Sequence, residues 1–483
     1  MFGKILSNKE INQISEASYR ILEKTGFHLP YQEALETLDE KGAEVDFKKE
    51  IVRVPKPLMK QAIENTPNKI KIYDRSGNNC RELGGEEVFF RPGSAPTKML
   101  DYDGKTRKAT AEDVKNVSLI ADALEHYKFI STPLPMDVPE SAQGWYAPYL
   151  MVKNCTNPLN RGSMGEEKGF EYMQKIFEAA RGGREELIEK PLDLYIACPT
   201  SPLSWSKSNA KFITKCAENQ MPISIISAPQ LGTTAPATLA GLLTQHNAEV
   251  LSGVLVTQLV RKGTPVTYGG STIVMDMRHG TSSLGSMEAM LLTAGCSCLA
   301  QHYELPHIDY VGPSDSLTTD AQSALEAAMG IFIGSLSKVD IITGPGLLEE
   351  ENCTSLEKLV IDHEICRMSL RGLKGITVDE ERIAEDVIRE IGPNGLFLKH
   401  KHTLDWHKKD IELPDEIVNR ENRSQWEKKG SKTMQDKANE KVKRIIKDHK
   451  PEEIPSDIKK DIDNAAEEIM KEQGIGSLPL GPK

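Results

Sequence analysis

The sequence has few aromatic residues and no long apolar run. Phe, Trp and Tyr together make up only 6% of its 483 residues, so an aromatic side chain near a predicted strand end is a candidate for a specific role. No stretch approaches the about 18 consecutive apolar residues of a membrane-spanning helix. The first residues also lack the apolar segment of a secretory signal. We therefore expect a cytoplasmic protein that binds no membrane.

Short catalytic motifs are missing as well. The sequence contains no Gly-x-Ser-x-Gly motif, no phosphate-binding P-loop and no Gly-x-Gly-x-x-Gly motif after a predicted strand. These absences argue against a serine hydrolase, a nucleoside triphosphatase and a dinucleotide-dependent enzyme.

The eight cysteines are scattered without a disulfide pattern, which is typical of a reducing compartment. Cys296 and Cys298 lie two residues apart in a predicted helix, so their side chains point roughly 200° apart. His302 could share a face with Cys298, but a single Cys/His pair in an apolar helix is more typical of a core. We expect the thiols to fill core space and no metal ion to be bound.

The charge balance is acidic, with 71 acidic against 60 basic residues and a net charge of -11. This argues against nucleic-acid binding, which favours a basic face. An acidic protein is better suited to a small cationic substrate, although net charge alone discriminates weakly between substrates.

The middle of the chain, about residues 110–395, is predicted to alternate strands with helices. Apolar runs between amphipathic segments are typical of a parallel sheet that helices cover. The predicted strands are Phe129–Thr132, Leu192–Ala197, Ile223–Ser227, Val266–Gly269, Ile308–Val311 and Ile341–Thr343. Their number favours an α/β fold, a TIM-type (β/α)8 barrel whose catalytic groups lie at the carboxyl ends of the strands. A doubly wound sheet is the alternative.

Two further parts are predicted to flank this domain. Residues 1–109 are predicted to form helices and hairpins that pack on the barrel, with one strand at Glu87–Phe90. Residues 396–483 are highly charged and are predicted to form a helical extension. A thin apolar stripe could dock this extension on the barrel or on another subunit; its residues are Ile458, Ile462, Ala466 and Ile469.

The segment Leu305–Glu326 is the most informative stretch of the chain. An apolar run, His307–Val311, opens into a Gly-Pro-Ser-Asp-Ser turn, and an alanine-rich helix then begins at Thr319-Asp320. A strand, a polar loop and a helix start in this order place reactive groups at the mouth of an α/β barrel.

Together with three other stretches, this segment resembles the trimethylamine methyltransferase (MttB-like) family. The other stretches are Thr234–Leu251, Gly263–Gly280 and Gly344–Asp362, so the resemblance extends over most of the chain. It implies a barrel enzyme that moves a methyl group from a methylamine to the cobalt of a separate corrinoid protein. It also implies that the partner carries the corrinoid, that this chain binds no cofactor tightly, and that the chain forms a homo-oligomer.

The sequence departs from the trimethylamine enzymes, which carry pyrrolysine in this loop. The loop here, Asp315–Thr319, holds only ordinary residues. Members without pyrrolysine resemble quaternary-amine demethylases, acting on compounds such as glycine betaine, proline betaine or carnitine. A quaternary nitrogen leaves as a neutral tertiary amine without an acid, so the protein need only orient the methyl group and exclude water. A methylated pterin as donor, or a non-catalytic partner that only docks a corrinoid protein, are the alternatives.

The candidate site residues are of three kinds. Asp315 and Ser316, on the loop that the resemblance singles out, are the candidate catalytic residues, and Arg91 or Arg278 would bind a substrate carboxylate. Arg278 could equally pair with Asp276. Aromatic faces hold a quaternary ammonium because it offers no hydrogen bond. The aromatic candidates are Phe90, Trp145, Tyr149, Tyr268 and Tyr310, each of which alone is more typical of a core.

Overall fold

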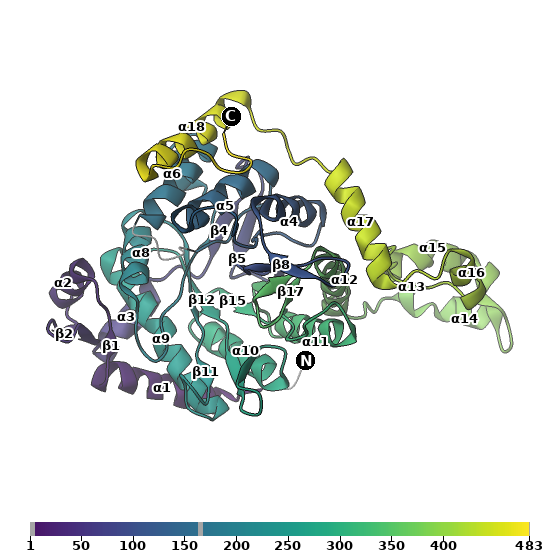
Figure 1. The fold of residues 1–483 in the computed structure, drawn as a ribbon. Coiled ribbons are helices and arrows are strands. Elements are labelled where there is room, and N and C mark those ends of the chain that lie inside the picture. Colours follow the sequence, from purple (N-terminus) through teal and green to yellow (C-terminus); the bar gives the residue numbers. More distant parts are fainter. Residues whose placement is uncertain (1–4, 163–167, 483) are drawn as a thin grey trace.

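The computed structural model describes residues 5–162 and 168–482, and a parallel sheet of six strands lies at its centre (Figure 1). The sheet has the order β6-β16-β15-β12-β10-β9. These strands are β6 (Phe89–Arg91), β9 (Tyr195–Ala197), β10 (Ile223–Ser227), β12 (Val266–Gly270), β15 (His307–Tyr310) and β16 (Ile341–Thr343). Every neighbouring pair is parallel, as the apolar runs predicted.

Two extended segments continue this sheet from β9 back to β6. Parallel bridges join Asp193 to Leu159, Leu159 to Ile130, and Tyr127 to Phe90. The segment predicted as a strand at Phe129–Thr132 therefore takes part in the sheet through single bridges rather than through a full strand.

The sheet separates two apolar cores. Side chains on one face pack against each other in a single cluster; they include Phe89, Phe129, Leu194, Ile196, Ile226, Ile308 and Ile341. Alternate residues, such as Tyr195 and Ile225, belong instead to the larger core beneath the helices. This alternation follows from the two-residue period of a strand, and it decides which side chains point to the inner face.

Helices cover the outer face of the sheet (Figure 1). They are α4 (Ala111–Ala123), α5 (Glu140–Asn154), α6 (Gly169–Arg181), α7 (Arg184–Glu189), α8 (Lys207–Glu218), α9 (Leu239–Val260), α10 (Met287–His302), α11 (Ala321–Leu336) and α12 (Leu356–Leu373). Among the described residues, no helix is both long enough and apolar enough to cross a membrane.

The N-terminal part packs mainly on α9. Its helices are α1 (Asn8–Lys24), α2 (Gln32–Glu40) and α3 (Lys56–Asn65), with the small strands β1 (Phe27–His28), β2 (Glu44–Asp46) and β3 (Ile51–Arg53). The hairpins β4–β5 (Ile70–Tyr73, Cys80–Leu83) and β7–β8 (Lys98–Leu100, Thr106–Lys108) confirm the prediction of hairpins in this region. Their neighbour β6 is not part of a hairpin as predicted, because it pairs in parallel with β16. The predicted divisions at residues 110 and 396 stay predictions.

Short strands follow the carboxyl ends of the central sheet. One group is β11 (Gln230–Leu231), β13 (Ile273–Asp276) and β14 (Thr281–Ser283). The other joins β17 (Leu347–Leu348) and β18 (Cys353–Thr354) to β7 and β8.

The C-terminal part first leaves the body and then returns to it (Figure 1). The outlying segment holds α13 (Glu380–Ile383), α14 (Glu385–Ile391), η1 (Phe397–Lys399), α15 (Lys401–Asp410) and α16 (Arg423–Lys428). Helix α17 (Met434–Asp448) returns along α12, and α18 (Ser456–Gln473) packs on α6 and α5. The apolar stripe predicted for this extension lies on α18 and forms its contact with the body, since Ile462, Ala466 and Ile469 are buried.

Candidate functional site

A buried arginine lies where three neighbouring strands end. Arg91 of β6 is opposite Thr343 of β16, and Thr343 is opposite Tyr310 of β15. Arg91 shares a strand face with Phe89, which belongs to the inner cluster, and Tyr310 packs against that cluster. The Arg91 Nη2 atom donates a hydrogen bond of 2.9 Å to Tyr310 Oη, and its guanidinium carbon lies 5.2 Å from the Tyr310 ring centroid.

The guanidinium of Arg91 forms no close ion pair within the described part of the chain, although the carboxyl groups of Asp193 and Glu351 lie near enough to interact with its charge. The side chain is fully buried, yet its Nε and Nη1 atoms have no hydrogen-bond partner there, and no carboxylate forms an ion pair with it. The hydroxyl of neighbouring Thr343 is also buried without a partner. Burying an unpaired guanidinium costs several kcal/mol. The arrangement is therefore a set of donors prepared for an anionic group.

A carboxylate reaches the same region from the turn between β17 and β18. Glu349, Glu350 and Glu351 have φ angles of 52°, 55° and 73°. This left-handed conformation costs a non-glycine residue about 1–2 kcal/mol. Lys98 holds Glu349 through an ion pair of 3.0 Å, and the backbone N–H of Ser282 donates to Glu350 Oε2 at 3.0 Å. Strain of this kind persists where the surroundings enforce it, often at functional sites.

Glu351 is directed to the end of the sheet near Arg91. The hydroxyl of Ser271, just after β12, donates to Glu351 Oε1 at 3.4 Å. Burial raises the pKa of Glu351 to about 7, against the smaller lowering effects of the Ser271 hydrogen bond and of the Arg91 charge. The carboxyl group therefore changes its ionisation near neutral pH.

Tyr310 and Cys198 border this cluster and remain partly exposed, as does Glu351. Burial, together with a smaller effect of the nearby Glu351 carboxylate, raises the pKa of the Cys198 thiol to about 12. Burial also raises the pKa of Tyr310 above its usual value. Both groups are thus protonated at neutral pH, and neither is prepared to act as a nucleophile.

The structure brings together two of the predicted site residues, Arg91 and Tyr310. Phe90 and Tyr268 instead point to the helix-covered core. The Tyr268 hydroxyl lies 3.2 Å from His246 Nδ1 and donates to Asn247 Oδ1 at 3.2 Å, so it ties β12 to α9.

Trp145 and Tyr149 lie on α5 beneath the C-terminal helix. Trp145 Nε1 donates to Gln473 Oε1 at 3.0 Å, and the Tyr149 hydroxyl donates to Asp463 Oδ1 at 2.8 Å. Both side chains are buried, and their contacts fasten α18 to the body.

Arg278 lies in the turn between β13 and β14. Its side chain is 82% exposed and forms the pair with Asp276 that the sequence allowed, with an Nη2–Oδ2 distance of 2.6 Å. A solvated, neutralised guanidinium has little to gain from a second anion. Of the two arginines predicted for a carboxylate, Arg91 has the environment that requires one.

Asp315 and Ser316 hold the loop before α11. Asp315 accepts hydrogen bonds from Ser283 Oγ at 2.5 Å and from the backbone N–H of Leu284 at 2.9 Å. Ser316 Oγ donates to Asp320 Oδ1 at 2.9 Å, which is the N-cap of α11. These contacts are those of positioning residues, and the catalytic role stays a prediction.

Glu351 and Thr343 were not among the predicted site residues. One signal for Glu351 was present, because three successive glutamates follow the Gly-Pro-Gly loop after the last predicted strand. Among the residues that the structure describes, no group of three His, Cys, Asp or Glu side chains is arranged to hold a metal ion.

Comparisons with known proteins agree on one family. A model described as trimethylamine methyltransferase (MTTB) matches residues 2–474. Trimethylamine methyltransferase MttB of Desulfitobacterium hafniense (strain DSM 10664 / DCB-2) is 32% identical over 471 residues, covering 97% of this chain and 94% of the relative. Glycine betaine methyltransferase of Desulfitobacterium hafniense (strain Y51) is 30% identical over 460 residues, covering 94% of each.

A solved structure supports the fold. The crystal structure of the monomethylamine methyltransferase MtmB of Methanosarcina barkeri superposes with a TM-score of 0.55. The match covers 92% of this chain and 89% of that chain at 12% identity. At this identity the likeness concerns the arrangement of the elements alone.

Proposed function

The chain belongs to the trimethylamine methyltransferase (MTTB) family, and from this premise we propose that it demethylates a small quaternary amine bearing a carboxylate. The acceptor is the cobalt of a separate corrinoid protein, and the product is a tertiary amine. Glycine betaine, proline betaine and carnitine are substrates of this class. The relative named glycine betaine methyltransferase supports the choice, since it matches nearly the whole chain.

The observation that carries this proposal is the unpaired guanidinium of Arg91. A substrate carboxylate would accept hydrogen bonds from Arg91 Nε or Nη1 and from the Thr343 hydroxyl, all of which lack a partner among the described residues. Charge-assisted hydrogen bonds of this kind are the strong ones in proteins. Trimethylamine has no carboxylate, so it would leave the buried charge uncompensated.

The cationic end of the substrate would lie towards Glu351 and the Tyr310 ring. An ammonium without N–H groups is stabilised by charge and by aromatic faces rather than by hydrogen bonds. Glu351 supplies the charge when ionised, and the bound cation would lower the pKa of this carboxyl from about 7. A zwitterionic betaine would thus pair each of its charges with one opposite charge of the site.

The site needs no acid or base for this reaction. A corrinoid partner would supply the methyl acceptor, and because the C–N bonding pair would stay on nitrogen, the amine would leave neutral. The task of Arg91, Thr343 and Glu351 is to fix the substrate with one methyl group towards the open end of the sheet. Cys198 and Tyr310 are protonated at neutral pH, which agrees with a site that positions the substrate and supplies no nucleophile of its own.

We further propose that the sheet closes into a (β/α)8 barrel with this site at its mouth. The bridges at residues 127, 130, 159 and 193 support closure, because they link β9 back to β6. The carboxyl ends of barrel strands form the working face of this fold. Cytoplasmic location suits the eight cysteines, none of which forms a disulfide in the described structure.

The test is a methyl-transfer assay with the purified chain and a reduced corrinoid protein. Glycine betaine, proline betaine and carnitine are compared with choline and trimethylamine, which lack a carboxylate. We expect the absorbance change from Co(I) to methyl-Co(III) with at least one betaine and not with trimethylamine. Turnover of trimethylamine alone, or of no amine, would overturn the proposal.

A further inference from the structure

Two buried polar groups near the end of the sheet have no place in the site described above. They are the Ser131 hydroxyl and the Asn160 Oδ1 atom, and neither has a hydrogen-bond partner among the described residues. Both side chains are fully buried. They lie in the two extended segments that continue the sheet from β9 back to β6, one residue after the bridged positions Ile130 and Leu159. Buried polar atoms are nearly always hydrogen-bonded in folded proteins, so these two indicate a missing partner.

Both side chains point to the inner face of the sheet. Ile130 and Leu159 belong to the core beneath the helices, whereas Phe129 belongs to the inner cluster. Successive side chains of an extended chain point to opposite faces. Ser131 and Asn160 therefore face inwards, as the substrate site does.

The Asn160 amide is fixed in one orientation. Its Nδ2 group donates to the backbone carbonyl of Leu194, so Oδ1 is the end left without a partner. A carbonyl oxygen only accepts hydrogen bonds, so the missing partner of Asn160 is a donor. Gly162, two residues further on, agrees with the inward direction, because a Cβ atom there would lie 3.1 Å from the Cβ atom of Ile196 in the inner cluster.

Both segments lie beside Arg91. The segment of Ser131 is bridged to β6, and the segment of Asn160 is bridged to that of Ser131 on one side and to Asp193 on the other. Burial raises the pKa of Asp193 well above its usual range, against smaller lowering effects that include the charge of Arg91. Because Asp193 lies beyond Asn160 in the sheet, the guanidinium is within electrostatic reach of the Asn160 segment. The raised pKa also favours the uncharged form of Asp193, so this side of the site offers little negative charge.

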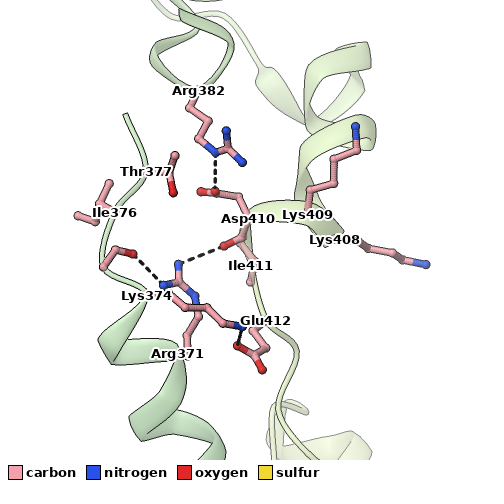
Figure 2. Close-up of a pocket in the computed structure, with 11 residues that line it drawn as sticks. Arg371, Lys374, Ile376, Thr377, Arg382, Lys408, Lys409, Asp410, Ile411 and Glu412 are labelled. Carbon is pink, nitrogen blue, oxygen red and sulfur yellow. Dashed lines mark hydrogen bonds and ion pairs between the residues drawn. The ribbon is translucent and has the colours of Figure 1, made fainter. Parts of the chain in front are cut away.

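The open cavity at the base of the outlying segment shows the contrast. It has a volume of about 350 Å³, and none of the residues that line it is buried (Figure 2). Arg371 donates to the backbone carbonyls of Gly375 and Asp410 at 2.9 and 3.3 Å, and Arg382 pairs with Asp410 at 3.3 Å. Charged groups that already have partners and water gain little from a ligand. The unmet hydrogen bonds at Ser131 and Asn160 are therefore the stronger indication of one.

We propose that Ser131 and Asn160 select, among carboxylated quaternary amines, a substrate with a hydroxyl group on the carbon chain between its two charges. With the carboxylate on Arg91 and Thr343, that hydroxyl would donate to Asn160 Oδ1 and accept from the Ser131 hydroxyl. One hydroxyl group meets both needs because it donates and accepts. A second ammonium would be buried here with little negative charge to pair with. This selection rests on the proposed function, in which Arg91 binds the carboxylate.

Two amines that differ only in this hydroxyl group provide the first test. Carnitine carries it, and γ-butyrobetaine has the same carboxylate, quaternary nitrogen and carbon chain without it. Titration calorimetry of each amine with the purified chain needs no corrinoid protein. We expect the dissociation constant of γ-butyrobetaine to be about 10- to 100-fold higher than that of carnitine, because γ-butyrobetaine leaves both protein groups buried without partners.

Two variants locate this preference in the chain. Ser131→Ala removes a hydroxyl that has no partner in the described structure, so its melting temperature should stay close to that of the wild type. It should weaken carnitine binding about 5- to 10-fold and leave γ-butyrobetaine binding unchanged. Asn160→Leu replaces the amide by an apolar group of similar size and should bring the two dissociation constants within about twofold of each other. Ser118→Ala, at an equally buried serine on α4, is the matched control.

The outcomes separate this selection from the proposed function. Equal dissociation constants for the two amines, or tighter binding of γ-butyrobetaine, would overturn the selection and leave the proposed function intact. A Ser131→Ala variant that weakens both amines by the same factor would assign Ser131 a structural role and overturn the selection as well, and this variant decides the question if Asn160→Leu does not fold. If carnitine, γ-butyrobetaine and glycine betaine all fail to bind, the proposed function fails, and the selection fails with it.

Discussion

The end of the central sheet and the outlying residues 376–413 differ in the kind of group that they leave without partners. At the sheet, the buried guanidinium of Arg91 has two nitrogen atoms without a hydrogen-bond partner and no close ion pair in the described chain. In residues 376–413, Leu398 and Leu404 are apolar side chains that remain in water. The first deficit calls for a small anion and the second for an apolar surface. A buried polar deficit thus indicates the chemistry of its ligand, whereas exposed apolar side chains alone do not identify what covers them.

The largest effect is expected from Arg91→Met, which removes the buried charge and leaves a shorter, unbranched apolar side chain in its place. We expect kcat/KM for the best betaine to fall about 100- to 1,000-fold, because the substrate carboxylate would be buried without its partner. The preference for betaine over choline should disappear in the same variant. Steady-state kinetics with both amines measures this preference.

Stability serves as the control for Arg91→Met. Since the guanidinium has one side-chain partner, Tyr310, in the described structure, its loss should leave thermal stability nearly unchanged or raise it. A variant that unfolds early but keeps the wild-type preference for betaine would mean that Arg91 is structural.

A smaller effect is expected from Glu351→Gln. The wild type should bind a cationic substrate better as the pH rises through about 7, the pKa of this carboxyl, because only the ionised form attracts the ammonium. The glutamine variant should lose about tenfold in kcat/KM at pH 8 and show a flatter pH profile between 6 and 8. An unchanged profile would remove Glu351 from the substrate site. Glu350→Gln, in the same turn, is the matched control.

The same variant should change stability in a definite pH window. Glu351 has a pKa of about 7 when folded and 4.5 as a free side chain, so the folded state holds its proton longer. The wild type therefore loses stability as the pH rises from 4.5 to 7, and the loss is constant above that range. Glu351→Gln should melt about 1–3 °C higher than the wild type at pH 8 and equally at pH 4.5. Thermal melts at both values test this.

The sequence predicted the strands well where apolar runs were continuous. Ile223–Ser227 and Ile341–Thr343 are strands with the predicted bounds, because every residue of such a run is buried on one face or the other. The segment near Phe129 was harder, since it joins the sheet only through bridges at Tyr127 and Ile130.

The site was less predictable for three physical reasons. Phe90 and Arg91 are neighbours in sequence, yet a strand directs them to opposite faces, and the pattern did not show which face was inner. Tyr149 is covered by Asp463, more than 300 residues away, which no local pattern reveals. Glu351 depends on three glutamates in a left-handed conformation that their residue type disfavours.

The smallest effect is expected from Arg278→Ala, which sharpens the contrast between the two arginines. Arg278 is 82% exposed and pairs with Asp276 in its own turn, so the pair should contribute about 0–1 kcal/mol to stability. Water and Asp276 already stabilise the exposed guanidinium, so a second anion adds little free energy of binding. We therefore expect kcat/KM for betaine to stay within about twofold of the wild type. Steady-state kinetics with betaine measure kcat/KM for Arg278→Ala and for Arg91→Met under the same conditions, so that the two losses can be compared. A large loss in the first variant would show that the β13–β14 turn folds over the substrate, and that exposure in the free protein is a poor guide to which arginine binds it.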